Sequence, residues 1–406
     1  MTSPPVDCAQ VRALFPSLAF GFGYLDNAGG SQIPEVVIAA MSDYCRTSYV
    51  QTGGSYPASV ATKRVLMEAH AFVAEFLNAG STGGIILGAS STALVHLLAN
   101  AFGETLRPGD EIIVADSNHE GNATPWYRLE RFGIKVIAWP VDPESMTCEL
   151  DALQPLLNER TRVVAFPHVS NLTGIVADVR AICDLVRAAG AVSVCDGVAF
   201  APHRAIDVQT LCCDFYFYST YKVYGPHLGA MYGRHEAWAP LTGPNHVFIA
   251  QDSFPTKWEL GSISYEGCAA MLGLRAYLAI LAGESYAGYA TVQRAFATMS
   301  ALEYAPHEQL YAWLASRPQV RIIGPRAFGP DAVGTLSFRH ASKSSAEIVD
   351  AVNRRELGIK HGNFYSVRLL RAIGVHPEDG VARVSLVHYN TVGEIDRLTG
   401  VLDELL

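Results

Sequence analysis

The fold is decided by the stretch Tyr216-Phe217-Tyr218-Ser219-Thr220-Tyr221-Lys222-Val223-Tyr224-Gly225-Pro226-His227, in which one lysine stands among aromatic residues after an apolar run. Gly225-Pro226 would end a strand here, at the carboxyl edge where open α/β sheets bind ligands. Desolvation beside aromatic rings lowers the pKa of a lysine, and an unprotonated amine can attack a carbonyl carbon. Lys222 is therefore a candidate nucleophile. The alternative is a surface lysine whose stem packs over an aromatic edge.

The composition is that of a globular protein. The 406 residues are 50% hydrophobic and 17% charged, which suits one large or two medium domains with a substantial core. A formal net charge of −9 argues against nucleic acid or an anionic membrane as the main partner, since neither attracts an acidic chain. No run approaches the roughly 20 apolar residues of a membrane span, and residues 1–5 lack the order of a signal peptide. We expect a cytoplasmic protein that acts on small molecules.

The eight cysteines contain no C-x-x-C pair, and residues 269–406 contain no cysteine. This pattern argues against a zinc knuckle and against a disulfide framework. We expect buried thiols and no metal site.

Short apolar runs recur through the first part of the chain, at 84–87, 111–115, 134–139, 162–166, 191–195, 214–218 and 228–232. The first five are separated by stretches long enough for crossovers, which predicts a mainly parallel seven-stranded sheet with helices on both faces. The last two runs are too close for a helical crossover, so 228–232 should run antiparallel. Before the sheet, the pattern predicts helices at 35–48 and from Pro57 onward.

After about residue 270 the pattern changes to two long helices, at 267–283 and 287–315. Shorter elements follow: strands near 319–323, 333–338 and 381–387, a helix at 345–356 and a final amphipathic helix. We therefore expect an arm at 1–21, a large domain at 22–269, and a smaller α+β domain at 270–406 that includes part of the arm.

Polar residues stand just past several predicted strands. Ser91 and Thr92 follow the first strand and begin a helix, whose N-terminus suits a phosphate. His119, Asn171 and Asp196 follow three further strands. Each has an ordinary structural explanation, as a helix cap, a loop histidine or a turn former. Their shared placement at one sheet edge with Lys222 favours a common site.

Together these parts suit a phosphorylated aromatic aldehyde. A lysine forms the Schiff base, a carboxylate keeps a ring nitrogen protonated, an imidazole stacks on the ring and a helix terminus holds the phosphate. The cofactor with these requirements is pyridoxal 5'-phosphate.

The sequence resembles the class V aminotransferase and cysteine desulfurase group of fold-type I pyridoxal-phosphate enzymes. The resemblance runs from about Tyr24 to the C-terminus and is carried by Tyr24-Leu25-Asp26-Asn27-Ala28, Asn118-His119 with Pro125-Trp126, His168-Val169-Ser170-Asn171, Asp196-Gly197, Ser219-Thr220-Tyr221-Lys222, and Arg383-Val384-Ser385-Leu386 with Tyr389-Asn390-Thr391.

The resemblance implies roles by position. Lys222 would bind the cofactor covalently, Asp196 would pair with the ring nitrogen, and His119 would stack on the ring. Asn171 would approach the phenolic oxygen, and the phosphate would be contacted by Ser91, Thr92, Ser219 and Tyr221. Arg383 would grip the substrate carboxylate, with Asn27 and Tyr365 as further substrate-binding residues. The segment Gly261-Ser262 would reach the neighbouring active site in a homodimer, which makes Ser262 a cofactor-binding residue of the partner's site.

Two positions depart from the family pattern. Desulfurases of the group carry a reactive cysteine on a loop, where this chain has Tyr365 in Gly362-Asn363-Phe364-Tyr365. A phenol cannot accept sulfur as a thiolate does. Ala199 replaces the usual glutamine or histidine near the phenolic oxygen. Both departures resemble the branch called cysteine desulfurase-like.

The resemblance implies an enzyme acting at Cα or Cβ of an amino acid. The first hypothesis is a lyase that eliminates a sulfur substituent from Cβ. The alternatives are an amino-acid epimerase or aminotransferase, and a pyridoxal-phosphate-binding protein without turnover.

Overall fold

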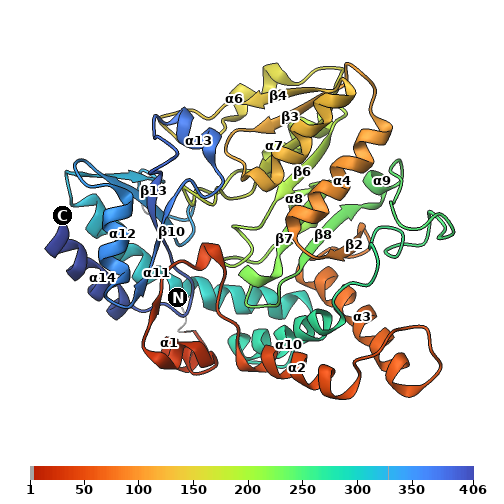
Figure 1. Cartoon of the computed structure of the whole chain (residues 1–406), viewed down its shortest axis with the longest axis horizontal. Coiled ribbons are helices and arrows are strands. Elements are labelled where there is room, and N and C mark those ends of the chain that lie inside the picture. The colour runs from red at the N-terminus through yellow and green to blue at the C-terminus, as the bar shows by residue number, and fades with distance from the viewer. Residues whose placement is uncertain (1–3, 328) are drawn as a thin grey trace.

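One large sheet between two layers of helices dominates the computed structural model, which describes residues 4–327 and 329–406 (Figure 1). Its seven strands lie in the order β2 (Gly83–Gly88), β8 (Gly229–Arg234), β7 (Phe215–Ser219), β6 (Val192–Asp196), β5 (Thr161–Pro167), β3 (Glu111–Ala115) and β4 (Lys135–Trp139). All pairs from β7 to β4 are parallel, and β8 is antiparallel to both neighbours. The predicted seven-stranded sheet and its one antiparallel strand are confirmed.

The aromatic run that precedes Lys222 is explained by burial on both faces of the sheet. Along β7, Tyr216 and Tyr218 pack in one core, whereas Phe215 and Phe217 pack in the other. All four rings are buried, as expected for a central strand covered on both sides.

Helices cover both faces of this sheet. One core includes residues of α2 (Glu35–Thr47), α3 (Pro57–Phe76), α7 (Val179–Ala188) and α10 (Tyr265–Ala282). The other core is closed by α4 (Ser91–Thr105), α5 (Thr124–Tyr127) and α9 (His235–Trp238). The helices predicted at 35–48 and from Pro57 are confirmed, with Pro57 in the first turn. Short helical segments complete the large domain: α6 (Leu150–Leu153), α8 (Val208–Leu211), η2 (Asn27–Gly29), η3 (Glu120–Asn122), η4 (Arg128–Phe132), η5 (Gln154–Leu156) and η6 (Thr220–Lys222).

A second, four-stranded antiparallel sheet forms the smaller body. Its order is β12 (Lys360–Gly362), β13 (Val381–Ser385), β10 (Thr335–His340) and β9 (Val320–Ile323). It packs against α12 (Ser345–Asn353), α14 (Val392–Leu405) and the end of α11 (Tyr289–Ala315). The predicted strands and helices of this region are present with shifted ends. The sequence patterns did not predict β12, β11 (Leu357–Gly358) or α13 (Val367–Ala372).

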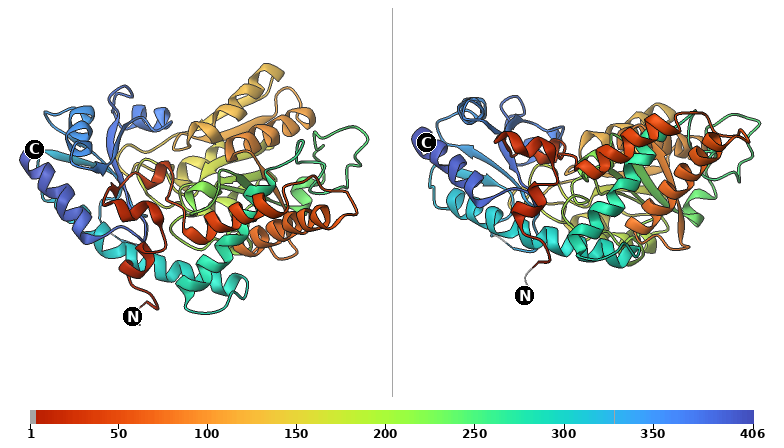
Figure 2. Two further views of the ribbon diagram at one scale, coloured as in Figure 1. Left: turned by 60° about the horizontal axis from the view of Figure 1, so that its bottom comes forward. Right: turned by 90° about the horizontal axis from the view of Figure 1, so that it is seen from below.

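The two bodies share the long helix α11, which runs from beneath the large sheet to the small one (Figure 2). Val292 and Phe296 belong to the core of the large domain, whereas Leu310 and Leu314 belong to that of the small domain. The expected boundary near residue 270 lies inside α10, whose buried residues pack in the large core. The change of core therefore falls along α11.

The N-terminal arm folds onto the junction of the two bodies (Figure 2). It contains α1 (Cys8–Arg12) and η1 (Pro16–Phe20), and Phe15 is buried in the core of the large domain. Arg12 Nη1 donates to Tyr389 O over 2.8 Å and lies 3.1 Å from Glu394 Oε1. The strand β1 (Gly23–Tyr24) then pairs in parallel with β11 of the small domain. The arm thus ties the start of the chain to its end.

Within the described part of the chain, α10 is the one helix long and apolar enough to cross a membrane. Just over half of it (56%) is buried inside the protein, where it packs with α2, α3 and α11. This packing accounts for its apolar composition.

Candidate active site

The candidate active site is a cavity at the carboxyl ends of β3, β5, β6 and β7. Every residue predicted to contact the cofactor, apart from Ser262, lines this cavity: Ser91, Thr92, His119, Asn171, Asp196, Ser219, Tyr221 and Lys222, together with Gly121, Pro167, Val169, Val198, Ala199 and Phe217. The sheet topology therefore brings these residues together as the sequence predicted.

Lys222 lies at the end of η6, directly after β7, and its side chain is buried. Burial lowers its pKa to about 8; Arg383 adds to this effect, and Asp196 opposes it. No described carboxylate lies within 4.0 Å of its ammonium as an ion-pair partner. At neutral pH about a tenth of the lysine is thus unprotonated and able to attack a carbonyl carbon.

Asp196 ends β6 and is buried in the same cavity. Burial raises its pKa to about 6, although a 2.9 Å hydrogen bond from Val198 N–H and the charge of Lys222 favour the ionised form. Among the described residues it has no ion-pair partner. A buried carboxylate without a cation is costly, so this site suits a ligand that carries a protonated nitrogen.

The N-terminus of α4 also borders the cavity, through Ser91 and Thr92. Ser90, not Ser91 or Thr92, caps this helix by accepting a hydrogen bond from Ala93 N–H. The Ser91 hydroxyl instead lies 2.7 Å from the Ser219 hydroxyl. A side chain at Gly229 would come within 2.3 Å of the Ser90 carbonyl carbon, so only glycine lets β8 approach this helix so closely. Hydroxyl groups beside a helix N-terminus are suited to a phosphate.

His119 lines the same cavity, and its ring is neutral. Burial, Lys222 and Arg383 lower its pKa to about 4. Its Nδ1 accepts a 2.9 Å hydrogen bond from Gly121 N–H, which places the ring proton on Nε2. A Cβ at Gly121 would stand 3.0 Å from this nitrogen and 3.1 Å from Thr92 Oγ1, so the glycine keeps the cradle open. A neutral imidazole is suited to stacking on a flat ring.

These observations fit pyridoxal phosphate. The cavity offers an unpaired buried carboxylate for the ring nitrogen, a buried lysine for the aldehyde and a helix terminus with hydroxyl groups for the phosphate. Tyr221, half-buried beside Ser219, stacks on His227 with ring centroids 4.8 Å apart.

Arg383 comes from β13 of the small domain and is buried next to the cavity. Its guanidinium donates to Asp26 Oδ1 over 2.8 Å and to Asn171 O over 3.1 Å. The Phe364 ring lies 3.8 Å from its central carbon. Its Nε is buried and has no hydrogen-bond partner among the described residues. This free donor is consistent with the predicted carboxylate-binding role.

Tyr365 is two-thirds exposed (67%), and its ring centroid lies 5.2 Å from that of His119. The tyrosine therefore borders the solvent side of the predicted stacking residue. No cysteine is among the described residues that line the cavity.

Asn171 lines the cavity, but its side chain also reaches into the small domain. Its Nδ2 donates to Phe364 O over 2.9 Å, and its Oδ1 accepts from Ser366 Oγ over 2.9 Å. One amide hydrogen remains for the predicted phenolic oxygen.

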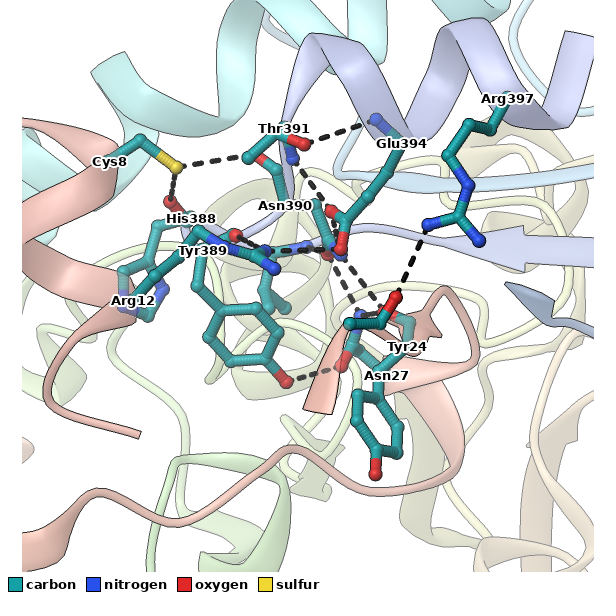
Figure 3. Close-up of polar contacts among 12 residues, drawn as sticks. Cys8, Arg12, Tyr24, Asn27, His388, Tyr389, Asn390, Thr391, Glu394 and Arg397 are labelled. Atoms are coloured by element: carbon teal, nitrogen blue, oxygen red, sulfur yellow. Dashed lines mark hydrogen bonds and ion pairs between the residues drawn. The ribbon is translucent and has the colours of Figure 1, made fainter. Parts of the chain in front are cut away.

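The side chain of Asn27, which was predicted to contact the substrate, instead bonds to other residues of the protein (Figure 3). The side chain is buried; its Nδ2 donates to Tyr24 O, Ser385 O and Asn390 Oδ1, and its Oδ1 accepts from Tyr389 Oη. Its polar atoms are thus already engaged in joining the start of the chain to the segment after β13, and nothing in this geometry supports a direct substrate contact.

Ser262 is exposed outside the cavity, where its hydroxyl accepts a 3.1 Å hydrogen bond from Gln51 Nε2. Its role in a neighbouring site stays a prediction.

Two residues of this region were not found from the sequence. Arg368 of α13 pairs with Glu120, directly after His119, and Ser366 bonds Asn171. These partners are 248 and 195 residues apart in the chain, and no local pattern connects them.

Comparisons with known proteins agree with this geometry. The chain is 37% identical to the aminotransferase-like protein FGM3 of Gibberella zeae, over all of both chains. It is 31% identical to the cysteine desulfurase-like protein ustD of Aspergillus flavus, over 99% of this chain and 91% of that protein. The structure resembles that of the cysteine desulfurase CsdA of Escherichia coli with a TM-score of 0.84 and 27% identity, covering 98% of each chain.

Fold, site and comparisons define a pyridoxal-phosphate-dependent enzyme of the aminotransferase and lyase type, with the fold-type I architecture. More narrowly, the chain belongs to the class V aminotransferase family, whose model matches residues 23–398. Members of this family act on amino-acid substrates.

Proposed function

We propose that the protein is a pyridoxal-phosphate-dependent lyase that eliminates a sulfur or similar substituent from Cβ of an amino acid. The observation that carries the proposal is the composition of the site. It has a base and a hydrogen-bond donor for the substrate carboxylate, but no thiol among its described lining residues. Lys222 lines the cavity, Arg383 donates to the backbone of the lining residue Asn171 and keeps an unpaired Nε, and the ring of Tyr365 lies next to His119.

The residues of the chain divide the work by position. When bound, pyridoxal phosphate supplies an electron sink for the negative charge that develops at Cα. Arg383 holds the substrate carboxylate, a task suited to a planar donor whose Nε is otherwise unpaired. Lys222, with a pKa of about 8, can accept the Cα proton at neutral pH. The β-substituent then leaves with its bonding electrons and takes up a proton, and one water molecule hydrolyses the remaining fragment, which gives a thiol, pyruvate and ammonia.

The absence of a thiol from the described lining of the cavity argues against persulfide chemistry. A desulfurase mechanism needs a thiolate that attacks the substrate sulfur. The neighbouring Cys195 is fully buried in the core on one face of the sheet, and burial raises its pKa well above the ordinary value. It cannot serve as the missing nucleophile.

The similarity to FGM3, an aminotransferase-like protein that is 37% identical over the whole chain, favours a second candidate. In an aminotransferase, the proton that Lys222 takes from Cα would not return to Cα, and no β-substituent would leave; in an epimerase a proton would return to Cα from the other face. The site residues serve these reactions equally well.

We further infer that the enzyme is a cytoplasmic homodimer. Leu260, two residues before Ser262, is an exposed apolar residue (58% exposed). Contact of this segment with a second copy would cover Leu260 and would bring Ser262 to the partner's phosphate site.

The test is incubation of the purified holoenzyme with S-substituted cysteines, with pyruvate and α-proton exchange measured together. The lyase proposal predicts stoichiometric pyruvate and thiol. Exchange of the α-proton without any pyruvate would exclude it and favour an epimerase or aminotransferase.

A further inference from the structure

The segment that replaces the cysteine loop of desulfurases is held in an unusual backbone conformation. Phe364 and Tyr365 have φ angles of 49° and 58°, in the left-handed region that residues other than glycine rarely adopt. Each such residue costs about 1–2 kcal/mol, so two in succession persist only where other contacts hold them.

Contacts from the large domain fix this segment, residues 363–368, which we call the 363–368 loop. Asn171 binds it twice, through Phe364 O and Ser366 Oγ. Glu120 also binds it twice: its N–H donates to Tyr365 O over 2.8 Å, and its carboxylate pairs with Arg368. Both anchors adjoin cavity residues, since Glu120 follows His119 and Asn171 itself lines the cavity.

The fixed loop places two aromatic rings, Phe364 and Tyr365, against residues of the site. We call these two rings the aromatic wall. Phe364 lies beneath the Arg383 guanidinium, and the ring of Tyr365 lies beside His119. Because the loop contacts His119 and Asn171, which line the cavity, a substrate side chain that leaves the cavity on this side would meet these two rings. The two arginines in contact with the loop are already paired, Arg383 with Asp26 and Arg368 with Glu120. The wall therefore favours an apolar or aromatic substituent over a charged one.

We propose that Tyr365 is a specificity-determining residue, and that the 363–368 loop selects amino acids whose β-substituent is apolar or aromatic. This inference rests on the proposed function for the identity of the substrate as a β-substituted amino acid. To that function it adds the chemical class of the β-substituent and the residue that selects this class.

The test uses the holoenzyme and two probes, S-benzylcysteine and S-(2-carboxyethyl)cysteine. Apparent dissociation constants come from the change in cofactor absorbance, and pyruvate is measured in parallel. The informative variant is Tyr365→Asn, because asparagine tolerates the left-handed conformation and should preserve the loop backbone. Tyr365→Phe keeps the ring, and Tyr304→Ala removes an exposed tyrosine of α11 as a matched control.

We expect the wild-type protein to bind the benzyl probe more tightly. Tyr365→Asn should weaken binding of that probe about three- to tenfold, the loss of one aromatic contact, and change the carboxyethyl probe less than about twofold. Tyr365→Phe, which keeps the ring, should retain the preference for the benzyl probe, and Tyr304→Ala should behave as wild type. An unchanged ratio of the two constants in folded Tyr365→Asn, or equal loss for both probes, would overturn the inference.

The two readouts separate this inference from the proposed function. If neither probe yields pyruvate but the binding preference depends on Tyr365, the lyase proposal is wrong and the specificity role of Tyr365 is supported. If both probes yield pyruvate and the preference does not depend on Tyr365, the lyase proposal is supported and the specificity role is wrong.

Discussion

The cofactor cradle around Lys222 and the 363–368 loop lie side by side, yet they are built in different ways. The cradle takes its side chains from the ends of successive strands in one domain, and most of them are buried. The loop comes from the other domain, exposes its tyrosine and depends on partners about 200 residues away in the chain. Sheet topology thus sets the cofactor chemistry, whereas substrate choice can change through the loop without disturbing the cradle.

The largest expected effect follows removal of the lysine of the cradle. Lys222→Ala takes away both the covalent anchor and the base, so turnover should fall by about 10²- to 10⁴-fold, the usual contribution of such a base, or more. Steady-state assays with added pyridoxal phosphate measure this, with Tyr304→Ala as the control that leaves the cradle intact. Activity within a few-fold of wild type would show that the cradle is wrongly assigned.

A second prediction concerns Asp196. Its removal should stabilise the apo-protein although it weakens cofactor binding. A pKa of about 6 for buried Asp196, against an ordinary 3.8, means that the folded apo-protein binds the proton more tightly than the unfolded chain. Its stability should therefore fall as pH rises from about 4 to 6, by about 3 kcal/mol in full.

Asp196→Asn removes this penalty. Urea unfolding of the apo-proteins should show the variant to be more stable at pH 7 and equal to wild type near pH 3.5, while its cofactor binds more weakly. A variant less stable than wild type at pH 7 would contradict the view that Asp196 lacks a cation in the empty cradle.

Arg383 belongs to both regions, since it donates to Asn171 O beside the cavity and stacks on Phe364 of the loop. Arg383→Lys loses the planar donor and the free Nε, so an amino acid should bind about ten- to a hundredfold more weakly, the loss of one charged hydrogen bond. Titration of cofactor absorbance with alanine measures this. A primary amine without a carboxylate is the control and should bind both proteins alike; unchanged alanine binding would exclude the clamp.

The smallest effect is expected for the ion pair that anchors the loop. Arg368 and Glu120 are each more than a quarter exposed, so Arg368→Met should cost about 0.2–1 kcal/mol of stability. Faster amide exchange at Glu120, whose N–H donates to Tyr365 O, would report a loosened loop. A loss of turnover as large as that of Lys222→Ala would contradict the view that the loop can change without disturbing the cradle.

The same contrast explains what could be predicted from the sequence. The seven strands, the antiparallel β8 and the meeting of His119, Asp196 and Lys222 follow from apolar periodicity and from the rule that parallel strands share one edge. The placement of a polar residue directly after an apolar run is a local feature of the sequence.

The loop and the domain junction could not be predicted in this way. The pairing of Arg368 with Glu120 and of Ser366 with Asn171 depends on how two domains dock. Asn27 was expected at the substrate because of its motif, but the network with Tyr389 and Asn390 is formed only when the two ends of the chain meet. The boundary expected at 270 did not anticipate that α11 serves both cores.

Everything proposed for the cradle depends on Lys222 being its covalent anchor. Reduction of the holoenzyme with borohydride, followed by proteolysis and mass spectrometry, tests this assignment. We predict a phosphopyridoxyl group on the peptide that contains Lys222. A group found on any other lysine, or none on a cofactor-loaded protein, would contradict it.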